Sequence, residues 1–329
     1  MGRFFKKIFS GVREALSDKD GARNEFEDKK PDALRNEIRM ISGCEDSQTS
    51  ADVSNVSGSG FSLPDPAGRA GGACTSTLLS VLYADEQVPE DDLSFTQVLN
   101  AMRVNLAEQG FTQIPQLTSS NPIDVNADFD LVPANATGTR RAVMIGINYV
   151  GDDPGELRGC HNDVLNMKKY IMHVHGFEED NITILMDDGE HDSPTKENIL
   201  EAYKKVIEET EESDAIFLHY SGHGTKVKDR DGDEADGYDE ALVPVDYQEE
   251  GLINDDDLYD ILCKPLAKGA TMVSLMDCCH SGTILDLPYI FKADGSMPEG
   301  MQLDESLDFD GLIQSFGGHV IGFLTNFLK

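Results

Sequence analysis

The sequence reads AIFLHYSGHG over residues 215–224 and TMVSLMDCCHSG over residues 271–282. Both stretches begin as a continuous apolar run, which is typical of strands whose two faces are covered by helices. Outward from them, apolar runs at 141–148 and 182–186 alternate with amphipathic segments at 163–175 and 196–211. This alternation predicts an α/β fold with a mostly parallel sheet flanked by helices on both faces.

Each of the two stretches ends in a polar segment, and functional side chains of open parallel sheets gather past the carboxyl ends of the strands. A thiol needs a base to become a thiolate, and the same base must protonate the leaving amine. We therefore predict a catalytic dyad of His223 and Cys279, with the backbone N–H groups of Gly224 and Cys279 as donors to the oxyanion. Either residue alone is more simply a structural histidine or an inert thiol, but together they favour catalysis.

The composition favours cations as partners, because the formal net charge of the 329 residues is −34. Nucleic acids require clustered Lys and Arg, so we expect no nucleic-acid partner and instead metal ions or basic peptides. Six cysteines without an exporting signal or paired Cys-x-x-Cys clusters indicate reduced thiols. No apolar run reaches the length of a membrane span, so we expect a cytoplasmic protein without a transmembrane segment.

The N-terminal part shows weaker patterns. Residues 1–16 mix bulky apolar and cationic side chains, so they could touch a membrane surface as an amphipathic helix, although a packing or disordered arm is the simpler interpretation. Helical spacing predicts helices near 32–40, at 75–84 and at 95–109, and a short strand follows at 112–120.

The segments at 221–224 and 277–282 resemble the His and Cys motifs of the metacaspases, which belong to the caspase-like clan of cysteine peptidases. The resemblance covers residues 140–288 as the large, p20-like region. It places the nucleophile at Cys279 rather than Cys278, because the family pattern is Asp-x-Cys-His-Ser-Gly. It also implies cleavage of peptides after Arg or Lys.

Recognition of a cationic side chain requires one or two desolvated carboxylates held in place. Asp277, two residues before the nucleophile, is one candidate, and the family resemblance adds Cys160, Asp163 and Ser221 to the substrate pocket. The alternative for Asp163 is a helix cap, which is a common use of aspartate.

Residues 51–126 resemble the small, p10-like region of the family, notably at GGACTS (71–76) and PQLTSS (115–120). This region precedes the large one, an order that resembles type III metacaspases. The predicted division is an N-terminal arm at 1–50, the small region at 51–139, the catalytic region at 140–290 and a C-terminal extension at 291–329. Because no linker runs from the large region into the small one, we expect the uncut chain to be active, and we expect a monomer.

The acidic segment at 229–240 superficially resembles an EF-hand loop, but its sixth position is Glu234 where glycine is required. The resemblance to metacaspases implies a different calcium site, made of Asp239, Asp255, Asp256 and Asp286. Surface carboxylates without a specific metal are the alternative. Another class of function also stays open: a calcium-responsive interaction protein with a silent peptidase centre, or a redox sensor that uses Cys278 with Cys279, or Cys160.

Overall fold

The computed structural model describes residues 28–43, 73–86, 88–89, 92–111, 113–152, 155–228, 237–279, 281–293 and 301–304. The predictions for residues 1–16, for the EF-hand-like segment at 229–236 and for residues 305–329 lie outside the described residues.

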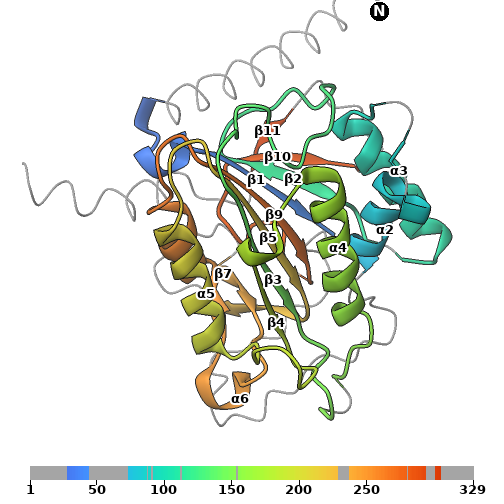
Figure 1. The fold of residues 1–329 in the computed structure, drawn as a ribbon, viewed down its shortest axis with the longest axis vertical. Coiled ribbons are helices and arrows are strands. Elements are labelled where there is room, and N and C mark those ends of the chain that lie inside the picture. The colour runs from blue at the N-terminus through green and yellow to red at the C-terminus, as the bar shows by residue number, and fades with distance from the viewer. Residues whose placement is uncertain are drawn as a thin grey trace, which may run out of the picture.

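The centre of the fold is an eight-stranded sheet with the order β11-β10-β2-β1-β9-β5-β3-β4 (Figure 1). Its strands are β1 (Glu37–Ser42), β2 (Gln116–Ser119), β3 (Arg140–Gly146), β4 (Ile182–Met186), β5 (Ala215–Ser221), β9 (Thr271–Asp277), β10 (Tyr289–Lys292) and β11 (Gln302–Leu303). Strands β1, β9, β5, β3 and β4 are mutually parallel, whereas β2, β10 and β11 pair antiparallel. The predicted mostly parallel α/β sheet is confirmed.

The principal helices are α2 (Ala73–Leu82), α3 (Phe95–Glu108), α4 (Cys160–His175) and α5 (Lys196–Glu208). Helix α4 connects β3 to β4 in one direction along the sheet, and α5 returns past β3 to β5. Because parallel crossovers are right-handed, these opposite directions place α4 and α5 on opposite faces. Helix α2 packs against both α3 and α4, as Figure 1 shows.

The helix predicted near residues 32–40 is wrong. A 3₁₀ turn, η1 (Asp32–Arg35), ends before Asn36, and the following residues form β1. Strand β1 lies between β9 and β2, and Ile38 and Met40 are fully buried there. Backbone pairing on both sides and burial of both faces outweigh a local helical pattern. A strand within the range assigned to the N-terminal arm therefore belongs to the central sheet.

A second sheet follows His223, where the sequence suggested only a polar connection. It contains β6 (Gly224–Lys228), β7 (Tyr238–Leu242) and β8 (Ile253–Asn254), in that order. The short elements α6 (Tyr247–Glu250), α7 (Asp255–Leu258) and the π-turn η4 (Tyr259–Cys263) continue the chain toward β9. The 3₁₀ turns η2 (Ala84–Glu86) and η3 (Glu179–Asn181) lie earlier in the chain. Antiparallel pairing of β6 with β7 brings Asp239 and Glu240 opposite Val227 and Lys226, a few residues after His223.

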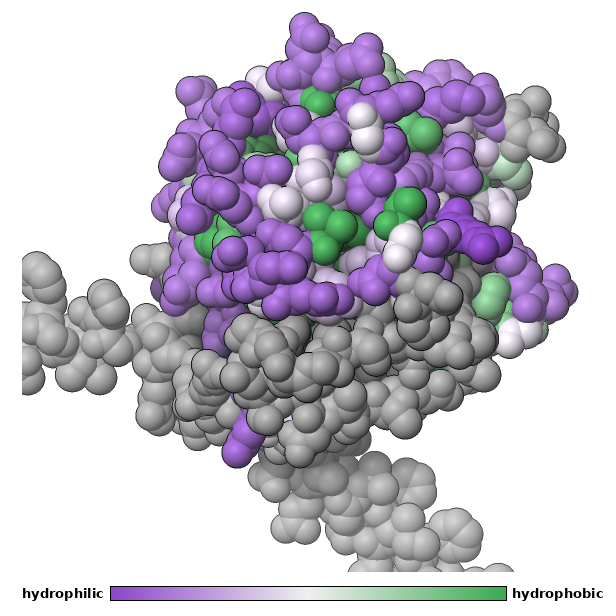
Figure 2. Space-filling view, turned by 90° about the horizontal axis from the view of Figure 1, so that it is seen from below, coloured by the Kyte–Doolittle hydropathy of each residue, from purple (hydrophilic) through white to green (hydrophobic). Residues whose placement is uncertain are grey.

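The surface is mainly hydrophilic, as the high content of charged residues leads us to expect. In Figure 2 the described part of the visible face is mainly hydrophilic, and its apolar residues form small separate spots. Within the described residues, no helix has the length and apolar character needed to cross a membrane.

Candidate active site

The two motif segments meet at one edge of the sheet. Ser221 at the end of β5 is in register with Asp277 at the end of β9. A Cβ atom added to Gly224 would overlap the backbone oxygen of Cys279. Only glycine therefore lets β6 begin this close to the residues that follow β9, 278–279 and 281–283, which we call the nucleophile loop. The structure therefore brings the predicted His223 and Cys279 segments into contact.

His223 is held by two groups that the sequence did not indicate. Its backbone N–H donates to the Tyr149 hydroxyl at 2.9 Å, and its ring Nε2 lies 2.7 Å from the Gly155 carbonyl oxygen. A carbonyl only accepts hydrogen bonds, so Nε2 carries the proton in this contact. Nδ1 is then the nitrogen that can accept a proton from a thiol.

The two adjacent cysteines differ in their surroundings. Cys278 packs in the hydrophobic core at 6% exposure, and burial raises the pKa of its thiol well above the ordinary value. Cys279 is partly exposed and forms no disulfide. Burial without a base keeps a thiol protonated and inert. Cys279 is therefore the thiol of this pair that a substrate can reach.

The predicted pocket residues lie together beside the nucleophile loop. The Ser221 hydroxyl donates to Asp163 Oδ2 at 3.0 Å, and both side chains are buried. Burial, and then the charge of Asp277, raise the pKa of the Asp163 carboxyl to about 8, although the bond from Ser221 acts in the opposite direction. The capping alternative for Asp163 is wrong, because α4 begins at Cys160 and its N-cap is Gly159.

Cys160 lies at the start of α4 and is fully buried. Its backbone N–H donates to Asn148 Oδ1 at 3.1 Å. Burial raises the pKa of its thiol, and Asp163 and Asp277 raise it further. A neutral thiol in this position can line the predicted substrate pocket but does not act as a nucleophile.

The carboxylate of Asp277 accepts two backbone hydrogen bonds from the start of α2. Thr75 N–H donates to Oδ2 at 2.6 Å, and Cys74 N–H donates to Oδ1 at 3.3 Å. These contacts join residues about 200 positions apart in the chain. The sequence indicated 71–76 only as part of the small-region resemblance, so this part of the pocket was not predicted.

The carboxylates predicted to bind a metal lie beyond the nucleophile loop. Oxygens of Asp239, Asp255 and Asp256 all lie within 4.8 Å of one another. Burial raises the pKa of Asp255, and the charges of Asp286, Glu240 and Asp239 raise it further. Asp286 itself has a left-handed backbone with φ 47°. The fold therefore brings three of the four predicted aspartates together, and the fourth, Asp286, lies near enough, like Glu240, for its charge to act on Asp255.

Glu240 connects this cluster to the nucleophile loop. Its Oε1 pairs with Lys226 Nζ at 3.2 Å, and the Thr283 hydroxyl donates to Oε2. Its backbone N–H donates to Asp255 Oδ2 at 2.7 Å. Lys226 is on β6, two residues after Gly224, and Thr283 is four residues after Cys279. Both catalytic segments are thus tied to the acidic cluster through one buried carboxylate.

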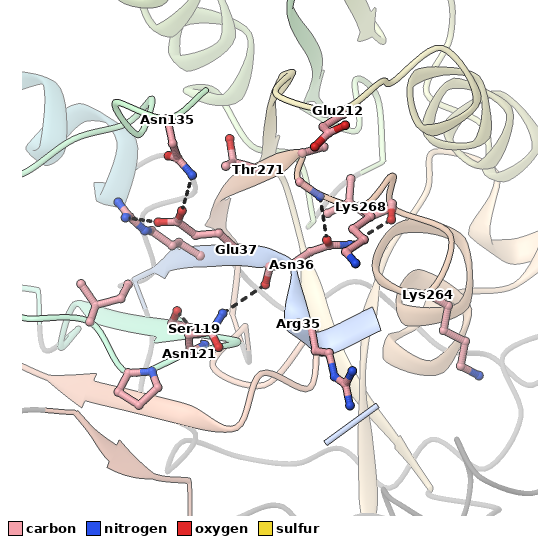
Figure 3. Close-up of a pocket in the computed structure, with 16 residues that line it drawn as sticks. Arg35, Asn36, Glu37, Ser119, Asn121, Asn135, Glu212, Lys264, Lys268 and Thr271 are labelled. Atoms are coloured by element: carbon pink, nitrogen blue, oxygen red, sulfur yellow. Dashed lines mark hydrogen bonds and ion pairs between the residues drawn. The ribbon is translucent and has the colours of Figure 1, made fainter. Parts of the chain in front are cut away.

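A cavity of about 810 Å³ lies at the opposite edge of the sheet, where β1 and β9 begin (Figure 3). Its lining includes Arg35, Asn36, Glu37, Lys268 and Thr271, and none of the predicted site residues. Asn36 donates to the Leu266 carbonyl and Asn135 to Glu37, so these wall groups bond to one another. The candidate active site is therefore assigned from the chemistry at the carboxyl ends of the strands and not from this cavity.

Comparison with known families agrees with this geometry. Residues 140–288 match the model of the metacaspase peptidase C14 domain, and residues 10–126 match the model of the caspase domain. The two matched ranges do not overlap, and the caspase-domain match precedes the metacaspase match in the chain.

Relatives share the same family name. The chain is 66% identical over 296 residues to Metacaspase III c of Phaeodactylum tricornutum, with 90% of this chain and 87% of that protein covered. It is 42% identical over 199 residues to Metacaspase-1 of Sclerotinia sclerotiorum, covering 59% of this chain and 46% of that protein. It is also 48% identical over 169 residues to Metacaspase-1 of Eremothecium gossypii, covering 50% and 37% respectively. With Cys279 and His223 brought together on an α/β sheet, this similarity shows that the chain belongs to the metacaspase family of cysteine peptidases, in the caspase-like clan.

Proposed function

We propose that the chain is a calcium-dependent endopeptidase that cleaves after Arg or Lys through a dyad of Cys279 and His223. The observation that carries the proposal is the pair of buried carboxylates, Asp163 and Asp277, beside the nucleophile loop. Two buried acids of like sign raise each other's need for a positive charge, so together they suit a cationic side chain that enters from the substrate.

The dyad would act as follows. The Cys279 thiol gives its proton to His223 Nδ1, and the thiolate attacks the carbonyl carbon of the scissile bond. The N–H groups of Gly224 and Cys279 stabilise the resulting oxyanion. His223 then protonates the leaving amine, and water hydrolyses the acyl-enzyme with His223 as base. The Gly155 carbonyl keeps Nε2 protonated and so keeps Nδ1 facing the reaction.

The direct test compares fluorogenic peptides that differ only in having Arg, Lys, Gln or Asp at the cleaved position. We expect cleavage of the Arg and Lys peptides in calcium, and little cleavage in chelator. A gel of the same samples should show the uncut chain during turnover, since activation without a cut is part of the proposal. Binding of calcium with no cleavage of any peptide would instead support the interaction protein with a silent centre.

The pH dependence of cation binding tests the role of Asp163. Its pKa of about 8 means that the carboxyl is largely protonated at neutral pH, and a cation prefers the ionised form. The affinity for the cation should therefore rise with pH until the pH exceeds the pKa of Asp163. Each pH unit below that pKa changes the affinity by up to about tenfold. We expect the inhibition constant of benzamidine to fall about tenfold or more from pH 6 to pH 8.5. Asp163→Asn should remove this slope, and a slope that survives the substitution contradicts the assignment.

We propose that calcium binds at Asp239, Asp255, Asp256 and Asp286. The donor set fits, because calcium takes several hard oxygen ligands, and clustered buried carboxylates repel one another without a cation. Bound calcium would supply the positive charge that neutralises this cluster. Within the chain, Glu240 connects the neutralised cluster to the nucleophile loop, because its carboxylate accepts a hydrogen bond from Thr283.

Replacing Asp255 or Asp286 with asparagine should weaken calcium binding about tenfold or more, because each change removes an anionic oxygen ligand. Calorimetric titration measures the affinity, and the melting temperature gives a second readout. In chelator, Asp255→Asn should melt at a higher temperature than the unmodified chain, since it removes a buried charge that Asp286, Glu240 and Asp239 oppose. Asp257→Asn is the matched control, because Asp257 is exposed on the same short helix. Equal affinities in all these variants would place calcium elsewhere.

A further inference from the structure

Helix α2 begins directly over the proposed substrate pocket, although it belongs to the region that precedes the catalytic one in the chain. We propose that the start of α2 is a positioning element of the pocket: Cys74 and Thr75 hold the Asp277 carboxylate toward the substrate cation, and Thr75 is itself fixed by His219. The inference rests on the proposed function, because it concerns how the Arg/Lys pocket is kept in shape.

The first part of this positioning element is the pair of backbone N–H donors at the start of α2. The first N–H groups of a helix have no acceptor within the helix, and the helix N-terminus favours negative charge. Thr75 N–H and Cys74 N–H bond to different oxygens of Asp277, at 2.6 Å and 3.3 Å. Two donors on two oxygens fix the plane of the carboxylate and favour its ionised form.

Among the residues that the structure describes, no backbone N–H donates to the second carboxyl of the pocket. Asp163 accepts from the Ser221 hydroxyl, a neutral side chain, and its pKa is raised to about 8. The two acids therefore have different parts. Asp277 is the carboxylate that backbone donors hold in place, and Asp163 ionises when the cation enters. The backbone donors at the start of α2 are therefore one source of the difference between the two carboxyls.

The third element is a side-chain bond that fixes the helix to the sheet. Thr75 Oγ1 lies 3.0 Å from His219 Nε2, and both residues are fully buried. Burial lowers the pKa of His219 to about 3, so the imidazole is neutral. His219 Nδ1 makes no hydrogen bond among the described residues. A buried orphan N–H is rarer than an orphan acceptor, so the proton belongs on Nε2, which donates to Thr75.

His219 lies close to the pocket along β5, so its bond to Thr75 affects the geometry of the pocket. His219 is in register with Leu275 on β9, and two residues further along the same strands Ser221 is in register with Asp277. Alternate residues of a strand share a face, so His219 lies one step below Ser221 on the pocket side. Thr75 thus contacts the sheet through its hydroxyl and the specificity carboxylate through its N–H. A shift of Thr75 would move the donors away from Asp277.

Thr77 is a matched control within the same helix. It is also buried, and its hydroxyl makes no hydrogen bond among the described residues. Threonine to valine at both positions changes the same atoms in the same helix. Only the change at Thr75 removes the bond to His219.

The experiment compares the full chain with Thr75→Val, Thr75→Ser and Thr77→Val in calcium. The measurements are kcat and KM for an Arg peptide, the inhibition constant of benzamidine, and the rate at which iodoacetamide alkylates Cys279. Iodoacetamide has no cationic group, so it reports on the nucleophile without using the pocket. Thermal melting checks that each variant is folded, and Thr75→Ala serves as the second variant if valine prevents folding.

For Thr75→Val we expect about a tenfold rise in KM and in the benzamidine constant, as for loss of one buried hydrogen bond and the alignment that it maintains. The value of kcat and the alkylation rate should change by less than about twofold, and Thr75→Ser should restore wild-type values, as should Thr77→Val. If Thr75→Val affects benzamidine no more than Thr77→Val does, or slows alkylation equally, the positioning role is overturned. If the unmodified chain neither binds benzamidine nor cleaves after Arg, the proposed function itself fails and this inference fails with it.

Discussion

Replacing Cys279 with alanine is expected to lower kcat/KM on an Arg peptide by about 10⁴-fold or more, because removal of a nucleophile leaves only binding and oxyanion stabilisation. The matched change Cys278→Ala should keep activity within about threefold, since surface and core positions that do not touch the reaction act mainly through stability. The structure gives the reason for this contrast: Cys278 is packed in the core with a raised pKa, and Cys279 is partly exposed beside Gly224.

Benzamidine binding separates loss of chemistry from loss of fold in this experiment. Cys279→Ala should bind benzamidine as the unmodified chain does, because the cation pocket is formed by other side chains. A rise in its inhibition constant together with a lower melting temperature would mean that the variant has lost structure. An inactive Cys278→Ala with an active Cys279→Ala would reverse the assignment of the nucleophile.

The catalytic half of the sheet could be predicted from sequence because its strands are continuous apolar runs between amphipathic helices. Strand β4 has the predicted bounds, 182–186, and β5 and β9 begin where the predicted apolar runs begin, at residues 215 and 271. Strand β1 could not be found this way. Its six residues include Glu37 and Arg39, and its burial arises only from pairing with β9 and β2, more than 70 residues away in the chain.

The same distinction holds within the site. His223, Cys279 and Asp277 directly follow or end strands, so their meeting follows from the parallel sheet. Gly155, Tyr149 and the start of α2 reach the site through loops and a helix. No periodic pattern marks Gly155 or Tyr149, and the helical spacing at 75–84 predicts α2 itself but not its contact with Asp277. Their contacts depend on how close the backbones come, as at Gly224 and Gly146, where a side chain would collide with Cys279 or Cys160.

The four acidic residues of the proposed calcium site could be named only from resemblance to a family, not from their spacing. They come from β7, from α7 and from the segment after Cys279. The three-stranded sheet that carries Asp239 and packs against α7 was not predicted. The carboxylates of a dense acidic stretch can be grouped into many possible metal sites, and the sequence does not choose among them. The packing of β7 on β8 and of α7 on both is what selects Asp239, Asp255 and Asp256.

Replacing Asp277 with asparagine should reduce kcat/KM for the Arg peptide by about 10²- to 10³-fold, in line with removal of one member of a buried, hydrogen-bonded charge pair. Asparagine keeps an oxygen that can accept from Thr75 N–H, so the start of α2 retains one of its contacts. The charge that faces the substrate is lost. The loss should be largest for Arg and Lys peptides, and the ratio of Arg to Gln cleavage should approach one.

Asp214→Asn is the matched control for this change. Asp214 is also buried next to a strand and accepts from Thr139 N–H at 2.6 Å and Glu211 N–H at 2.9 Å, but it comes immediately before β5, at the other edge of the sheet. It also pairs with Arg141, so its loss should lower the melting temperature without changing the preference for Arg. If Asp277→Asn behaves like Asp214→Asn, with less stability and an unchanged Arg-to-Gln ratio, then Asp277 supports the fold and the cation is recognised by Asp163 or by another group.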